Sequence, residues 1–316
     1  MAPILELRGV RKTYGDFVAV EGLDLSVPPG SIYGVLGPNG AGKSTTIRMI
    51  MNIYVRDAGE ILLAGRPLDR AATDRVAYLP EERGLYRKMK VHDHIVYLAR
   101  LKGMAAAEAA AKADAWLERF DLADRAEAKV DELSKGMQQK VQFIACVLPE
   151  PDLIILDEPF SGLDPINTRL LTDIIQEQRQ AGRTVLFSTH VLEQAEKICD
   201  HIVLIHRGKK LLDGGLDEIQ ERYPVDTIEV AGSFDTATLE SLDSVEKVFE
   251  QGTRWRVQMR DGLPHQELLR ELTERGEVDH FSAVRPPLTD IFVREVEREG
   301  LQLEEHEMDS AQGVSA

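Results

Sequence analysis

The chain has 316 residues, of which 43% are hydrophobic and 29% are charged. This composition is typical of a globular protein with enough apolar material for one or two cores, so it excludes global disorder. The 54 acidic and 38 basic side chains give a net charge of −16, whereas surfaces that bind duplex nucleic acid usually carry a basic excess that neutralises phosphates. We therefore expect no nucleic acid partner.

The N-terminal segment predicts short strands separated by turns. Strand-like stretches are ILEL (4–7), FVAV (17–20) and, after the turn Pro28-Pro29-Gly30, the apolar SIYGVL (31–36). The third stretch leads into a glycine-rich segment, and IRMIMNIY (47–54) then has a helical pattern. The order strand, glycine-rich loop and helix follows from these patterns.

The middle of the chain predicts a helical block followed by alternating strands and helices. Residues 91–148 have helical patterns with few β-branched runs. Strands return at DLIILD (152–157) and TVLFST (184–189), with a helical pattern over 166–181 between them, and HIVLIHRGKKLL (201–212) predicts a strand hairpin. This alternation implies an α/β fold with a largely parallel sheet and helices on its faces.

The C-terminal third differs in composition and pattern. Residues 221–316 carry 22 acidic and 10 basic side chains, against 32 and 28 in residues 1–220. Beyond Tyr223-Pro224, alternating stretches around a helical pattern predict a small α+β accessory domain over 223–297. Residues 298–316 are acidic with little periodicity, and we expect a disordered tail there.

Two further features favour a reducing compartment and argue against a membrane span or a signal peptide. No apolar run approaches the ~18–20 residues that a helix needs to span a bilayer, and charges occupy the N-terminal segment where a signal peptide would need its apolar stretch. The two cysteines, Cys146 and Cys199, lie in apolar surroundings, and we expect them to be buried thiols rather than parts of a disulfide framework or a zinc site.

The segment GPNGAGKS fits the G-x-x-x-x-G-K-[ST] phosphate-binding loop in its proper context between an apolar strand and a helix. Its glycines let successive backbone N–H groups curl around an anion, and the helix N-terminus adds the positive end of its dipole. Lys43 would pair with the β- and γ-phosphates, and the Ser44 hydroxyl would be a Mg²⁺ ligand. The predicted nucleotide-binding residues are Gly37, Pro38, Asn39, Gly40, Ala41, Gly42, Lys43, Ser44 and Thr45.

The strand LIILD (153–157), with the glutamate that follows it, predicts the acidic part of the same site. Asp157 would stand at the carboxyl end of the strand and hold Mg²⁺ directly or through water. Glu158 would orient and polarise the attacking water as a general base. Many buried strands end in polar residues, so this interpretation depends on the phosphate loop upstream.

The segment LSKGMQQK (133–140) narrows the choice among nucleotide-binding folds. It opens a helical pattern shortly before the acidic strand, and here the chain resembles the ATP-binding subunits of ABC transporters, whose signature reads Leu-Ser-Gly-Gly-Gln. Ser134 and Gly136 at a helix N-terminus would form a second anion site. The resemblance covers about residues 3–220 and implies a P-loop ABC ATPase core over 1–222, with an antiparallel N-terminal β part and the helical insert.

Three more positions match landmarks of that family in order. Tyr14 matches the aromatic residue that stacks on adenine. Asp164, in Ser161-Gly-Leu-Asp164, matches the loop that communicates across the dimer, and His190 matches the histidine that contacts the γ-phosphate. The resemblance implies that these side chains bind ATP or act in its hydrolysis.

Two departures from the family pattern bear on the site. Family members usually carry Gln after the third core strand, where this chain has Glu81. We hypothesise that Glu81 keeps a metal-sensing role and makes hydrolysis more dependent on Mg²⁺. Lys135 and Met137 replace Gly and Gln in the signature; Lys135 either adds a cation to this second anion site or is solvated.

The resemblance also implies partners and a cycle. Two ATP-binding subunits, in a homodimer or a heterodimer, would enclose two ATP molecules and hydrolyse them to ADP and phosphate. Separate transmembrane permease subunits would dock near residues 81–90, which places the chain in the cytoplasm on the inner face of the cell membrane. The 223–297 domain would be regulatory, dimer-stabilising or an inert packing module.

The subgroup is indicated by LPEERGLY (79–86) and PPLTDIF (286–292), which resemble the ATPases of bacterial ABC-2-type exporters, including sodium-extrusion systems. The implied function is export of sodium or a small molecule. The alternative is a soluble ABC-type ATPase in DNA repair or translation. Such proteins typically carry two cassettes, long coiled coils or zinc cysteines, which this sequence lacks.

Overall fold

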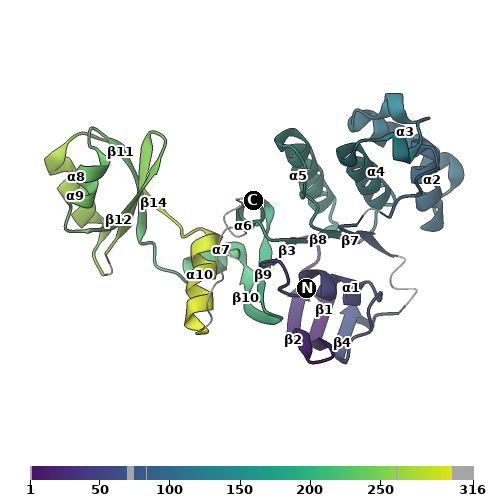
Figure 1. The fold of residues 1–316 in the computed structure, drawn as a ribbon, viewed down its shortest axis with the longest axis horizontal. Helices are drawn as coiled ribbons and strands as arrows, with labels where there is room; N and C mark the ends of the chain where they lie inside the picture. Colours follow the sequence, from purple (N-terminus) through teal and green to yellow (C-terminus); the bar gives the residue numbers. More distant parts are fainter. Residues whose placement is uncertain (1, 70–74, 83, 261, 301–316) are drawn as a thin grey trace. The chain divides into compact units, whose positions relative to one another are not determined.

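The computed structural model describes residues 2–69, 75–82, 84–260 and 262–300. These residues divide into two compact units (Figure 1). The first contains the chain up to Leu216 together with the residues from Val296 on, and the second contains Asp217–Glu295. The predicted acidic tail lies outside the described residues from position 301 onward.

An antiparallel sheet begins the first unit, in the order β2-β1-β4-β5. The predicted stretches ILEL and FVAV overlap much longer strands, β1 and β2. The apolar stretches were shorter than the strands because polar side chains on the exposed face of each strand alternate with buried ones. Register shifts interrupt the pairing near Gly9, whose φ is positive. The bounds are β1 Leu5–Tyr14, β2 Phe17–Val27, β4 Ala58–Leu63 and β5 Arg66–Pro67.

The central sheet has the order β10-β9-β3-β8-β7-β6, and all pairs in it are parallel except the β9–β10 hairpin. This confirms the predicted parallel α/β sheet. Strands β3, β7 and β8 are buried along their whole length, which explains their continuous apolar runs. The strands are β3 Ile32–Leu36, β6 Val76–Leu79, β7 Leu153–Asp157, β8 Thr184–Thr189, β9 His201–His206 and β10 Lys209–Gly215.

The helices that accompany this sheet begin next to its strand ends (Figure 1). They are α1 Lys43–Ile50, α5 Pro165–Gln180 and α6 Leu192–Ile198. Helix α7 Leu216–Glu221 follows β10 in the chain and belongs, from Asp217 on, to the second unit. Helix α1 begins and ends earlier than the predicted pattern over 47–54, and that prediction is wrong at its C-terminal end. Asn52 has a φ of +54°, and the N–H groups of Ile53 and Tyr54 fold back onto the Arg48 carbonyl, so the helix closes there.

The predicted helical block contains three α-helices that pack together (Figure 1). They are α2 Val91–Leu101, α3 Ala106–Arg119 and α4 Lys135–Val147, with short 3₁₀ turns η2 Ala123–Arg125 and η3 Val130–Glu132 between α3 and α4. Their buried faces recur at helical spacing, as Val91, Ile95 and Ala99 do in α2. Cys146 in α4 and Cys199 after α6 are both buried free thiols, as predicted.

The second unit is an antiparallel sheet with helices, as the α+β prediction requires. The sheet order is β12-β13-β11-β14, and its core includes Ile228, Val257 and Leu268. The elements are β11 Thr227–Gly232, α8 Thr236–Glu240, β12 Val245–Gln251, β13 Arg254–Met259, α9 His265–Arg275, β14 Val278–Val284 and α10 Leu288–Arg298. Across the part of the chain that the structure describes, none of the helices combines the length and apolar character needed to cross a bilayer.

Candidate functional site

The glycine-rich loop connects β3 to α1 and touches neighbouring backbone on two sides. Gly37 and Gly42 have φ values of +149° and +106°. A Cβ atom at Gly37 would lie 2.0 Å from the Ile205 carbonyl oxygen, and one at Gly42 would lie 2.4 Å from that of Ala19. These positions therefore require glycine.

The remaining loop residues differ in exposure. Asn39 and Gly40 form the exposed tip, Pro38 and Ala41 are buried, and Ser44 and Thr45 are half-buried in the first turn of α1. The structure thus places the whole predicted phosphate loop as one continuous turn at a helix N-terminus.

Lys43 is the buried cation of this loop, with 5% of its surface exposed. Its Nζ donates hydrogen bonds to the Gly37 carbonyl (2.7 Å) and the Pro38 carbonyl (3.1 Å), and lies 3.5 Å from Glu158 Oε1. Burial lowers the pKa of Lys43, and the negative charges of Glu158, Asp157 and Glu81 oppose that shift. The ammonium group therefore lies between the loop and the acidic strand end.

Asp157 ends β7 and is fully buried. Its Oδ1 accepts hydrogen bonds from the hydroxyls of Ser44 (3.1 Å) and Ser188 (2.6 Å). Its Oδ2 is buried with no hydrogen-bond partner among the described residues. Buried carboxylate oxygens are rarely left unpaired, so this atom, next to the Ser44 hydroxyl, fits a divalent cation that prefers oxygen ligands.

Glu158 follows directly in a left-handed backbone conformation, with a φ of +49°. Its backbone N–H donates to Ser188 Oγ (3.0 Å), and its Oε2 lies 3.0 Å from His190 Nδ1. The carboxylate is only 10% exposed. The structure therefore brings Lys43, Glu158 and His190 together at the carboxyl ends of neighbouring parallel strands.

Ser188 is a site residue that the sequence analysis missed. It accepts a hydrogen bond from the Glu158 backbone and donates one to Asp157. The available signal was its position: Ser188 pairs with Asp157 in the parallel register of β7 and β8. A serine at the end of the neighbouring strand belongs to the same sheet edge.

Glu81 follows β6 and is exposed. It lines a cavity of ≈ 170 Å³ together with Asp157, Glu158 and two glutamines of α4. The cavity therefore joins the predicted metal and catalytic carboxylates. The structure places Glu81 where its charge acts on Lys43.

The predicted residues Tyr14, Ser134, Gly136 and Asp164 lie elsewhere on the first unit. Within the described residues, none of them makes a hydrogen bond or ion pair with the phosphate loop, Asp157, Glu158 or His190. Tyr14 is 45% exposed at the end of β1, with Lys12 Nζ 5.4 Å from its ring centroid.

The other three lie at helix N-termini. Ser134 is exposed and caps α4 by accepting a hydrogen bond from the Met137 backbone N–H (3.3 Å), and Gly136 follows in its first turn. Asp164 caps α5, and the hydrogen bonds donated by the backbone N–H and the side chain of Asn167 help to lower its pKa. All three therefore mark helix starts, with Ser134 and Asp164 exposed and Gly136 half-buried, rather than parts of the buried site around Lys43 and Asp157.

Comparisons with known proteins agree with this geometry. Residues 20–161 match the family model described as ABC transporter. The protein "Uncharacterized ABC transporter ATP-binding protein YhaQ" of Bacillus subtilis is 42% identical over 93% of this chain and 98% of its own length. The chain belongs to the family of ABC transporter ATP-binding subunits.

The ABC transporter ATP-binding subunit has further matches that include its C-terminal part. Residues 214–296 match a model described as "ATP-binding protein DrrA1-3-like, C-terminal domain". The "Nod factor export ATP-binding protein I" of Cupriavidus metallidurans is 35% identical over 95% of this chain and 99% of its own length. A solved structure titled "Structure of ATP binding subunit of ABC transporter" superposes with a TM-score of 0.66 at 34% identity, covering 69% of this chain and 92% of that one.

These findings confirm the predicted family and fold. The protein is the ATP-binding subunit of an ABC transporter, with a P-loop ABC ATPase core and a small α+β C-terminal domain. It hydrolyses ATP to drive transport, and it works at the membrane with separate permease subunits.

Proposed function

We propose that this ATP-binding subunit drives an exporter on the inner face of the cell membrane. Two subunits, identical or different, enclose two ATP molecules, and their closure and reopening moves the separate permease. The similarity to a protein named for Nod factor export supports the direction. The cargo that we propose is a small molecule or sodium.

The observation that carries the ATP-hydrolysing part of this proposal is the position of the Glu158 carboxylate between Lys43 and His190. Glu158 acts as general base: it orients the water that attacks the γ-phosphate and accepts its proton. Lys43 pairs with the β- and γ-phosphates, and His190 contacts the γ-phosphate while its Nδ1 fixes the direction of the Glu158 carboxylate.

We propose that Ser44 and Asp157 would hold Mg²⁺, which would supply positive charge that offsets the negative charge of the ATP phosphates. The unpartnered Oδ2 of Asp157 and the nearby Ser44 hydroxyl support this assignment. Glu81 is exposed in the same cavity and would contact the metal through water, so hydrolysis depends more strongly on Mg²⁺ than with a glutamine there.

The exposed residues complete the site across the dimer. Ser134 and Gly136 at the start of α4 bind the γ-phosphate of the ATP that the other subunit holds. Asp164 lies in the loop that faces the partner. The exposure of Ser134 and Asp164 in one chain supports this arrangement, because a site shared by two chains is incomplete in each of them. Tyr14, which is also exposed, stacks on adenine.

The test is Glu158→Gln, with Glu193→Gln as a matched control on an exposed carboxylate of α6. We expect Glu158→Gln to lower kcat by about 10²- to 10⁴-fold and, with ATP present, to retain a polytopic membrane protein during purification from detergent-solubilised membranes. The control should hydrolyse ATP like the wild type. Undiminished hydrolysis in Glu158→Gln would show that Glu158 is not the base, and recovery only with ribosomes or DNA would favour the soluble alternative.

A further inference from the structure

We propose that Gln139 is a positioning residue: its side-chain amide holds the Pro159 carbonyl and thereby sets the direction of the neighbouring Glu158 carboxylate. This inference rests on the proposed function, in which Glu158 is the general base. Gln139 itself does not touch the reacting atoms in this proposal.

The backbone of Glu158 needs support from its surroundings. Its φ of +49° is a strained conformation for a residue with a side chain, and such conformations persist only where neighbouring groups hold them. Two hydrogen bonds hold the Glu158 peptide itself: its N–H donates to Ser188 Oγ (3.0 Å), and its carbonyl accepts from the Ser161 N–H (3.1 Å). The direction of the peptide between Pro159 and Phe160 still has to be fixed.

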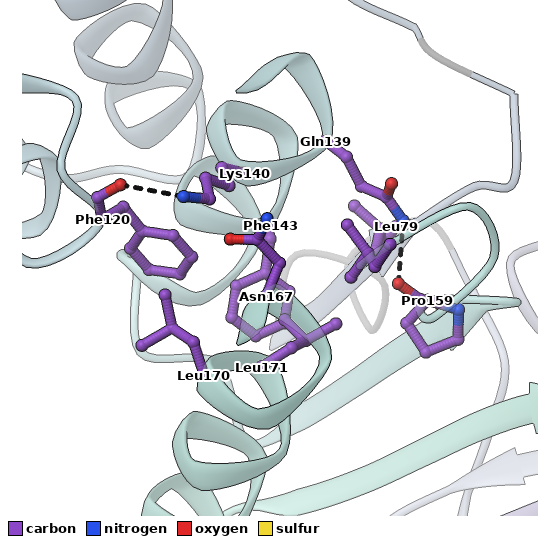
Figure 2. A pocket seen from close by; sticks show the side chains of 10 residues that line it. Leu79, Phe120, Gln139, Lys140, Phe143, Pro159, Asn167, Leu170 and Leu171 are labelled. Atoms are coloured by element: carbon purple, nitrogen blue, oxygen red, sulfur yellow. Dashed lines mark hydrogen bonds between the residues drawn. The ribbon is translucent and has the colours of Figure 1, made fainter. Parts of the chain in front are cut away.

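Gln139 supplies that third support. Pro159 has no N–H to donate, and its carbonyl oxygen accepts a hydrogen bond of 2.8 Å from Gln139 Nε2. Figure 2 shows this bond crossing from α4 to the loop after β7. The peptide between Pro159 and Phe160, one residue beyond Glu158, is therefore tied to a helix of the helical block.

A second glutamine on the same face of α4 makes a parallel contact. Gln142 donates to the Pro80 carbonyl at 3.3 Å, directly before Glu81. Residues three apart lie on one helix face, and both glutamines line the ≈ 170 Å³ cavity with Asp157 and Glu158. This face of α4 is thus directed at the acidic ends of β6 and β7.

The contact has a mechanical consequence. Ser134 caps helix α4, and we propose that ATP bound to the other subunit makes contact there; Gln139 lies little more than one turn further along the helix. A displacement of α4 by that ATP therefore reaches Glu158 through one hydrogen bond. The orientation of the base in one site would then depend on the nucleotide in the other.

The first test removes the donor while keeping the shape, with Gln139→Met. Its matched control is Gln138→Met, because Gln138 lies on the same helix but donates to the carbonyls of Val130 and Leu133 within the helical block. In the full-length subunit we expect Gln139→Met to lower kcat by about 10- to 100-fold, with KM for ATP changed by less than about twofold. Gln138→Met should stay within about threefold of the wild type.

The second test restores the donor by protonation, with Gln139→Glu. A protonated carboxyl group can donate to the Pro159 carbonyl, whereas a carboxylate cannot. Its charge would also face Glu81, Asp157 and Glu158 in the cavity. We expect the ratio of kcat in Gln139→Glu to kcat in the wild type to rise as the pH falls, while the same ratio for Gln139→Met stays flat.

The outcomes separate this inference from the proposed function. Equal losses in Gln139→Met and Gln138→Met, or a flat ratio for Gln139→Glu, would overturn the positioning role. Normal hydrolysis in Gln139→Met alongside a lost hydrolysis in Glu158→Gln would overturn it while leaving the base assignment intact. Normal hydrolysis in Glu158→Gln would instead overturn the proposed function.

Discussion

Two helices of this subunit begin in the same way but in different surroundings. Helices α1 and α4 both start with a lysine, Lys43 and Lys135, next to a glycine. Lys43 is buried and bonded to the loop carbonyls, whereas Lys135 is exposed. A Cβ at Gly42 would clash with the Ala19 carbonyl, but one at Gly136 would meet nothing within 4 Å.

A helix N-terminus alone therefore does not make a phosphate site. Both helices offer N–H groups and the positive end of a dipole. Only α1 adds a buried cation, a tightly packed glycine loop and two carboxylates at the end of β7. The start of α4 has a serine cap and open space, as expected of a half-site that a second chain completes.

The largest expected difference between the two helix starts concerns their lysines. Lys43→Ala should lower kcat by about 10²- to 10³-fold, because it removes a charge aimed at the developing phosphate charge. Lys135→Ala should change kcat by less than about threefold, because the side chain is exposed. Steady-state ATP hydrolysis measures both. A loss in Lys135→Ala as large as that in Lys43→Ala would mean that the comparison is wrong and that Lys135 is part of a full site.

A smaller difference concerns the cap of α4. Ser134→Ala should lower hydrolysis about tenfold by weakening ATP-dependent dimerisation, and should cost about 1 kcal/mol of stability through the lost N-cap. ADP binding to the single subunit should not change. Light scattering with ATP and calorimetry with ADP test the two expectations.

The matched control for this variant is Asp235→Ala, which removes the N-cap of α8 in the second unit. It should affect stability and leave hydrolysis at the wild-type rate. If both variants lose hydrolysis equally, the effect of Ser134 arises from folding and not from a shared ATP site.

The smallest effect is a pH dependence specific to the α1 site. Burial lowers the pKa of Lys43 in the protein alone, and the phosphates of ATP would raise it again. The bound form then holds more protons between these two pKa values, so ATP binding takes up protons there and affinity falls as the pH rises through that window. Calorimetry in two buffers of different ionisation heat measures the uptake; proton release on binding would contradict it.

The sequence was sufficient for the parts of the site that are local in the chain. The loop around Lys43 has a fixed spacing and lies between a buried strand and a helix, so its conformation followed from the residues themselves. Asp157 and Glu158 end a buried strand, and parallel strands end at one edge. Their convergence with His190 could therefore be expected.

The parts that could not be predicted depend on pairs distant in sequence. Ser188 meets Asp157 only through the register of β7 and β8, and Gln139 meets Pro159 only through the packing of α4. The length of β1 was also missed, because its exposed polar side chains, such as Arg8, resemble a loop when the partner strands are unknown. In each case the deciding interaction is absent from the local pattern.

The left-handed backbone of Glu158 carries a cost that the charge of the same side chain offsets. A glycine there would adopt the same φ without strain, which is worth about 1 kcal/mol. The same change would leave the buried Lys43 ammonium without its carboxylate neighbour, and removing one partner of a buried ion pair costs about 3–5 kcal/mol. Selection for thermal tolerance alone is therefore expected to keep a carboxylate at this position, so that folding and ATP consumption depend on the same side chain.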